Sequence, residues 1–142
     1  MALKYVDPDQ VLVYFAGSRI QGFADGEFIT YERMTPGFQE VVGTDGEVTR
    51  SKSNDFRSKI VIKLMQSSAS NAFLSSILNT DLNAPNGAGV GTFQLQDLNG
   101  NTLVSGSQSW IVSYPQGSFD RTAKSREWEI HIADTVQTEG GN

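Results

Sequence analysis

The sequence predicts a mainly β protein, an antiparallel β-sandwich or partly closed barrel with one short flanking α-helix. Several segments alternate apolar and polar residues with a period of two, most clearly in residues 58–65. Strong turn signals such as Asn99-Gly100 separate these segments. A single stretch, about residues 68–79, carries an apolar stripe with helical spacing. Short strands joined by hairpins are typical of sandwiches and barrels.

The strand pattern also assigns faces. Strands are expected at residues 11–16, 27–33, 38–42, 58–65, 92–98, 102–104, 108–114 and 127–133. In residues 58–65 the side chains Ile60, Ile62 and Leu64 share one face, and Lys59 and Lys63 share the other. The first face is therefore predicted to lie in the core and the second outside it.

Aromatic residues and the helix complete the predicted core. Trp110 and Trp128 fall on the apolar faces of their strands, so both are expected to be buried rather than displayed to a ligand. The helical stripe consists of Phe73, Leu74, Ile77 and Leu78. A helix of about three turns needs a sheet to pack against, so we expect it to flank the sandwich.

Two segments lie outside this pattern. Residues 43–57 are polar and rich in turn formers, and they predict a long extended loop or a hairpin that leaves the core. The tail from about Thr135 is polar and is predicted to be flexible. Residues 1–142 are otherwise expected to form a single domain.

The composition excludes several functions. The chain has a net charge of −5 and a pI near 4.7, so it repels nucleic-acid phosphates and anionic membranes. It contains no cysteine, which excludes a disulfide framework, a cysteine zinc site and a thiol nucleophile. The absence of cysteine fits a reducing compartment.

No catalytic constellation is apparent. The one histidine, His131, lies near Glu127 and Glu129 on the polar face of its strand, where a surface position is expected. The glycine-rich run 87–91 lacks the Lys-Ser/Thr ending of a phosphate loop and leads into a strand instead of a helix. We therefore predict no enzymatic activity, no catalytic or metal-binding residue and no cofactor.

The densest basic cluster allows two interpretations. Arg50, Lys52, Arg57, Lys59 and Lys63 are interspersed with the acidic residues Asp45, Glu47 and Asp55. Contact with a neighbouring subunit and simple solvation are equally favoured. Nucleic-acid binding is less favoured, because no aromatic platform accompanies the cluster.

Several stretches resemble the tail tube proteins of contractile-tailed bacteriophages. These are residues 22–33, 41–55, 97–100 and 126–128, in an order and spacing that extend over residues 10–132. Such proteins are similar in fold to the tube subunits of type VI secretion systems and contractile bacteriocins. The resemblance implies a structural protein without enzymatic activity or cofactor.

The resemblance also implies an assembly. Six copies would form a homohexameric ring, and rings would stack into a hollow conduit through which phage DNA passes without specific binding. The implied partners are the tail sheath, baseplate and tail terminator proteins, with no membrane. The implied location is the virion tail, assembled in the host bacterial cytoplasm.

Residues and resemblance together suggest two contact surfaces. The predicted inter-ring contact comprises Asp45, Glu47, Arg50, Lys52, Asn54 and Asp55, whose alternating charges suit contacts that specify orientation. The predicted subunit-contact strand face carries Lys59 and Lys63. The alternatives are a tube subunit of a type VI or bacteriocin-like device, a small β-sandwich binding module and, with His131 as nearly its only support, an enzyme.

Overall fold

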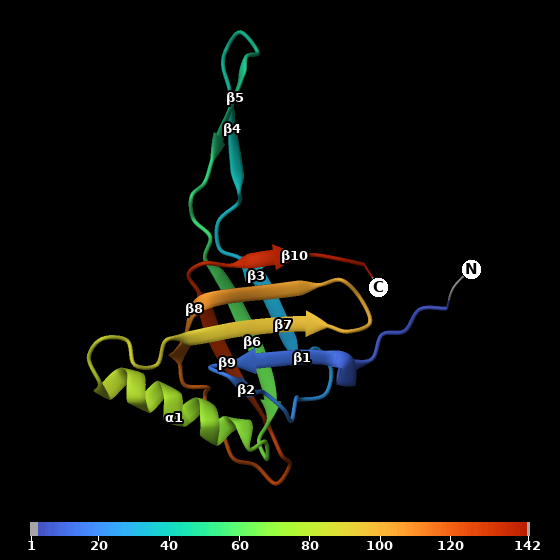
Figure 1. Cartoon of the computed structure of the whole chain (residues 1–142), viewed down its shortest axis with the longest axis vertical. Helices are drawn as coiled ribbons and strands as arrows, with labels where there is room; N and C mark the ends of the chain where they lie inside the picture. Colours follow the sequence, from blue (N-terminus) through green and yellow to red (C-terminus); the bar gives the residue numbers. More distant parts are fainter. Residues whose placement is uncertain (1–2, 142) are drawn as a thin grey trace.

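The computed structural model describes residues 3–141, so residues 1, 2 and 142 of the predicted domain lie outside the described residues. It confirms the mainly β class: an eight-stranded antiparallel sheet in the order β2-β1-β7-β8-β9-β6-β3, with β10 on β8, folds over without closing (Figure 1). The strands are β1 Val11–Phe15, β2 Ser18–Arg19, β3 Ile29–Arg33, β4 Phe38–Val42, β5 Val48–Lys52, β6 Ser58–Met65, β7 Gly91–Asp97, β8 Leu103–Ser113, β9 Ser125–Ile132 and β10 Val136–Thr138. A 3-10 helix, Pro8–Gln10, precedes β1, and α1 is Ser70–Asn83.

Strand β8 belongs to both layers of the sandwich. On one side β8 pairs with β7 from Leu103 to Ser109, and on the other side residues 103–105 pair with β10 and residues 109–113 pair with β9. The pairing register shifts on each side of this change of partner, which is how bulges bend a strand. The predicted strand that starts at residues 102–104 and continues at residues 108–114 is therefore one bent strand, β8, that carries the chain from one layer to the other.

The bend in β8 is held by Gly106 and Asp134. The Asp134 carboxylate accepts hydrogen bonds from the amides of Ser107 at 3.1 Å and Gln108 at 3.0 Å, and from the Ser107 hydroxyl. The hydrogen bond from the Ser107 hydroxyl lowers the pKa of Asp134, and the hydrogen bonds from the two amides lower it further. A Cβ atom on Gly106 would lie 2.1 Å from Ile132 Cγ2, so the backbone passes Ile132 where only glycine fits.

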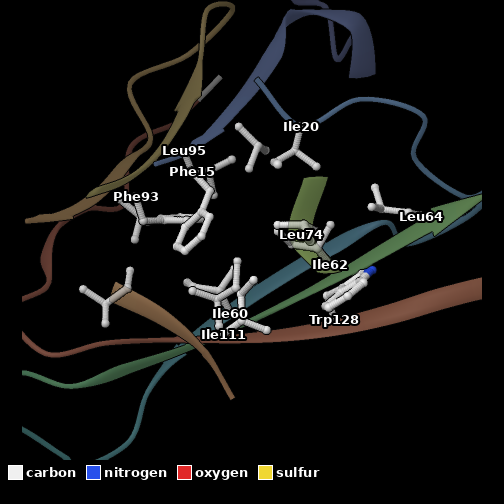
Figure 2. Close-up of a cluster of buried hydrophobic side chains, with 14 of the residues drawn as sticks. Phe15, Ile20, Ile60, Ile62, Leu64, Leu74, Phe93, Leu95, Ile111 and Trp128 are labelled. Atoms are coloured by element: carbon white, nitrogen blue, oxygen red, sulfur yellow. The ribbon is translucent and has the colours of Figure 1, made fainter. Parts of the chain in front are cut away.

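The core lies between the two layers (Figure 2). Its fully or almost fully buried members are Val13, Phe15, Ile20, Ile60, Ile62, Leu64, Leu74, Leu78, Phe93, Leu95, Val104, Ile111, Trp128, Ile130 and Ile132. The inward face predicted for residues 58–65 is confirmed, and so is the burial of Trp128. The Trp128 indole nitrogen donates to Asn71 Oδ1 at 2.9 Å, which satisfies its polar group inside the core.

The predicted helix is confirmed with shifted ends. Leu74 and Leu78 are buried, and Phe73 and Ile77 pack against the core as partly buried residues. The helix begins at Ser70, and the Ser68 hydroxyl in the preceding turn accepts the Ser70 amide at 3.2 Å and donates to the Gln21 carbonyl at 2.6 Å. It then continues past Asn79 to Asn83.

The prediction that Trp110 lies in the core is wrong. Trp110 pairs with His131 across β8 and β9, and both side chains point outward, while Ser109 and Ile111 are buried. The sequence suggests instead that the aromatic residues Trp110 and Tyr114 face the core, with Ser109 and Ile111 facing outward. The inward position at 109 is filled by a serine, whose hydroxyl is satisfied by the Gly91 carbonyl at 2.8 Å.

The segment after Thr135 differs from the polar, flexible tail that the sequence predicts. Val136–Thr138 form β10, paired with Leu103–Ser105 of β8, and Thr135 itself is buried. The Tyr31 hydroxyl donates to Glu139 at 2.7 Å. Burial, followed by this hydrogen bond, raises the pKa of Tyr31 to about 12. Long-range pairing with β8 supplies the backbone partners that the local sequence does not indicate.

The close approach at Gly106 predicts a selective loss of stability. We expect Gly106→Ala to lower the free energy of unfolding by about 1–3 kcal/mol, because the added methyl group overlaps Ile132. Gly117→Ala is the matched control: a Cβ there meets no atom within 4 Å, and we expect a change within about 0.5 kcal/mol. Urea unfolding followed by far-ultraviolet circular dichroism measures both. Equal midpoints for the two variants would contradict the proposed packing constraint.

Candidate assembly interface

The β4–β5 hairpin stands away from the sandwich. The two strands pair only with each other, from Phe38 opposite Lys52 to Val42 opposite Val48, and every residue of both strands is exposed. At the tip, the Gly43 amide donates to the Glu47 carbonyl at 2.8 Å. The hairpin forms the far end of the long axis of the molecule (Figure 1). Of the two predicted alternatives for residues 43–57, a long loop or a hairpin, the structure shows the hairpin, which ends at Lys52 and includes the strand predicted separately at residues 38–42.

Apolar side chains are exposed on both faces of the hairpin. Their exposed fractions are 51% for Phe38, 70% for Val41, 64% for Val42 and 57% for Val48. Directly opposite residues share a face, so Val42 and Val48 project to one side and Val41 to the other. An isolated two-stranded hairpin is at best marginally stable in water. These side chains were not among the predicted contact residues, although the apolar pair 41–42 beside a polar stretch was the available signal.

The turn of the hairpin carries only acidic charges, and its bases lie on the arm. Asp45 and Glu47 lie in the exposed turn, where Asp45 Oδ1 accepts the Glu47 amide at 3.1 Å. Arg50 and Lys52 lie lower, on the arm, and the Arg50 guanidinium stacks 4.3 Å from the centroid of the Phe38 ring. The tip is therefore acidic, whereas the arm carries the two bases together with Glu40, which lies opposite Arg50.

Asp55 ties the root of the hairpin to the sandwich. Its carboxylate accepts hydrogen bonds from Arg57 Nε and Nη2, both at 2.9 Å, and from Thr35 Oγ1 at 2.6 Å. The Arg57 guanidinium, followed by the Thr35 hydroxyl, holds the pKa of Asp55 well below its usual range. Asp55 thus joins the two chain segments that enter and leave the hairpin, while its neighbour Asn54 is exposed.

Two main-chain hydrogen bonds complete the root. The Ser53 amide donates to the Gly37 carbonyl at 2.8 Å, which brings the two arms together at their base. The Thr135 amide donates to the Phe56 carbonyl at 3.0 Å, and this bond links the root to the segment that follows β9. The hairpin is exposed along its length but firmly held where it begins.

Lys59 and Lys63 lie on the outer face of β6, as predicted. Lys59 Nζ is 3.6 Å from Glu129, and His131 Nε2 is 2.7 Å from the same carboxylate. Lys63 lies opposite Glu127 on β9. His131 is partly buried on this outward face, beneath the edge of Trp110. The face therefore carries mixed charges in register across two strands.

Other kinds of site find little support in the part of the chain that the structure describes. Among residues 3–141, no three His, Asp or Glu side chains converge in a way that could hold a metal ion. Within the same range, no helix has both the length and the apolar character needed to cross a bilayer.

The chain is similar in sequence or in fold to known proteins. The family model described as bacteriophage PhiTE tail tube protein matches residues 14–140. The structural protein ORF10 of Pseudomonas phage KPP10 is 28% identical over 123 residues, covering 87% of this chain and 71% of that protein. In a cryo-EM structure, the cap that terminates the tube of the anti-feeding prophage has a TM-score of 0.65 and 10% identity, covering 97% of this chain and 94% of that chain. The last likeness concerns the fold alone.

The root network predicts that Asp55 controls the mobility of the hairpin. We expect Asp55→Ala to lower the heteronuclear ¹⁵N NOE throughout residues 38–53, because the arms lose the carboxylate that joins Thr35 to Arg57. In Asp45→Ala, the matched control, any change should be confined to the turn, since that carboxylate contacts only the Glu47 amide. Unchanged NOE values in Asp55→Ala would contradict this role.

The lowered pKa of Asp55 makes a second prediction at the same site. A carboxylate whose folded-state pKa is depressed stabilises the fold above its unfolded pKa, and the contribution is lost as pH falls through the folded value. The root should therefore keep its NOE values through pH 4, where free carboxylates titrate, and loosen only in stronger acid. Loosening that follows an ordinary carboxylate titration near pH 4 would contradict the assignment.

Proposed function

Because the chain belongs to the family of the bacteriophage PhiTE tail tube protein, we propose that it forms hexameric rings that stack into a hollow conduit for phage DNA. The family is one of structural tube proteins, and we propose no catalytic role. The observation that carries the proposal is the exposed β4–β5 hairpin, whose apolar side chains on both faces need a partner to cover them.

The hairpin supports an axial contact between rings. Its Asp45, Glu47, Arg50, Lys52 and the neighbouring Asn54 are available at the surface, as the proposed inter-ring contact requires. Asp55 contributes in a different way, by fixing the direction in which the hairpin projects. A contact between unlike surfaces of identical subunits leaves a stack open at both ends, which is how a tube grows.

The outer face of β6 and β9 supports a lateral contact within the ring. Lys59 and Lys63 lie there in register with acidic residues of β9, so a neighbouring subunit with the same pattern could exchange ion pairs with them. The sheet is also open, with β2 and β3 at its ends. Joining the sheets of neighbours in a ring would cover these edges, as barrel closure does.

The acidic composition supports a conduit. A net charge of −5 per subunit discourages DNA from adhering to the assembled wall. We propose that the tube lies inside a contractile sheath in the virion tail, with baseplate and terminator proteins at its ends, and that it assembles in the host cytoplasm. Negative-stain images of concentrated purified protein should show rings or tubes with a central hole. A monodisperse monomer at all concentrations would contradict the proposal.

Removing the hairpin should separate folding from assembly. Because Gly37 and Ser53 already meet through a hydrogen bond of 2.8 Å, residues 38–52 can be replaced by an Asn-Gly turn. We expect this variant to keep the circular dichroism spectrum and unfolding midpoint of the sandwich and to form no tubes in electron micrographs. Tubes of normal length from the shortened chain would show that the hairpin is dispensable.

A further inference from the structure

A second exposed element lies at the other end of the molecule from the hairpin. Residues 114–124 join β8 to β9 and approach the sandwich beside Met65, the last residue of β6, which pairs with Ser125. The hairpin leaves beside Ser58, the first residue of β6. An eight-residue strand separates them, a length of about 26 Å. Figure 1 shows the two elements at opposite ends of the long axis.

The 114–124 segment displays an aromatic side chain in a basic setting. All its residues except Pro115 are exposed, and Phe119 is 86% exposed. The Arg126 guanidinium lies 5.6 Å from the centroid of the Phe119 ring and donates to the Ser118 carbonyl at 3.3 Å. These contacts hold the ring in position while leaving it uncovered.

The charge of this end is positive. Within residues 114–126, Arg121, Lys124 and Arg126 outnumber the one acid, Asp120, which pairs with Lys124 at 3.4 Å, and the next acid, Glu127, lies opposite Lys63 on β6. The hairpin tip has the opposite character, because residues 43–48 contain Asp45 and Glu47 and no base. One end of the molecule therefore presents acids beside exposed valines, and the other presents bases beside an exposed phenylalanine.

We propose that residues 114–126 of one copy receive the β4–β5 hairpin tip of the next copy along the tube. The inference rests on the proposed ring-stacking function and names its second surface. A like-to-like contact would oppose acid to acid, whereas head-to-tail contact pairs Asp45 and Glu47 with the basic segment and covers Phe119 with Val42 and Val48. Each end is complementary to the other and not to itself, so stacking has a fixed polarity.

Charge exchange tests the contact directly. One variant carries Asp45→Lys and Glu47→Lys, and the other carries Arg121→Glu and Lys124→Glu. We expect each alone to raise the protein concentration needed for tube formation at least tenfold, because like charges then face each other. A mixture of the two variants should form tubes again, since each end of one becomes complementary to an end of the other. Electron microscopy and sedimentation measure assembly, and circular dichroism verifies that each variant is folded.

Matched controls separate this inference from the function on which it rests. A single chain that carries the hairpin substitutions together with Lys4→Glu, Ala72→Glu and Ser76→Glu makes the same charge change at exposed positions outside the proposed contacts and should not restore tubes. If the 114–124 variant assembles like the wild type, or the mixture stays unassembled, the receiving surface is wrong although the tube function stands. If the 114–124 variant forms normal tubes that no longer bind a protein at the tube end, the segment binds that protein, and the inference is overturned. A wild-type chain that forms neither rings nor tubes would refute the function itself.

A covalent test gives an independent readout. The chain has no cysteine, so Asp45→Cys combined with Ser118→Cys introduces one thiol at each end. The two positions lie at opposite ends of one molecule, so a disulfide between them joins different copies. Oxidised tubes should give a ladder of covalent oligomers beyond the dimer on a non-reducing gel, and neither single variant should. Tubes of the double variant that yield only monomers, even with a short thiol cross-linker, would contradict the contact.

Discussion

The bend of β8 is the constraint on which the rest of the structure depends. One strand must serve both layers, so its backbone passes Ile132 at a distance that admits only Gly106. The amides released at the bend are satisfied by the Asp134 carboxylate. One residue further, the Thr135 amide donates to Phe56 at the hairpin root. The bend therefore places the two layers, β10 and the base of the hairpin at the same time.

The paired strands β6 and β9 turn this arrangement into a two-ended module. Their inner faces lie in the core, and their outer faces carry charges in register. The hairpin leaves at one end of the pair and the 114–124 segment at the other, so a rigid ladder sets the spacing between the proposed axial contacts. The hairpin and the segment expose aliphatic or aromatic side chains beside charged ones, a combination that suits specific association between copies.

Individual residues show why local patterns predict some features and miss others. The alternation in residues 58–65 predicts the buried face correctly, because strand geometry alone sends successive side chains to opposite sides. Trp110 escaped prediction because the register of β8 with β7 shifts between Gly106 and Ser109, and this bulge reverses which side chains face the core before the strand reaches Trp110. Val136–Thr138 form a strand only because β8 offers an edge more than 30 residues earlier in the chain. Asp55 appeared among other charged residues, and only the folded root shows that it joins Thr35 to Arg57.

The sequence by itself determined the β class, the single helix, a projecting loop or hairpin and the tail tube resemblance, because these follow from periodicity, turn residues and a distinctive order of motifs. Tertiary structure alone decided that β8 bends between layers, that Asp55 anchors the hairpin and that a basic segment stands at the opposite end from an acidic tip. Those features depend on which distant residues come together, and contacts between distant residues carry no local periodicity from which they could be predicted.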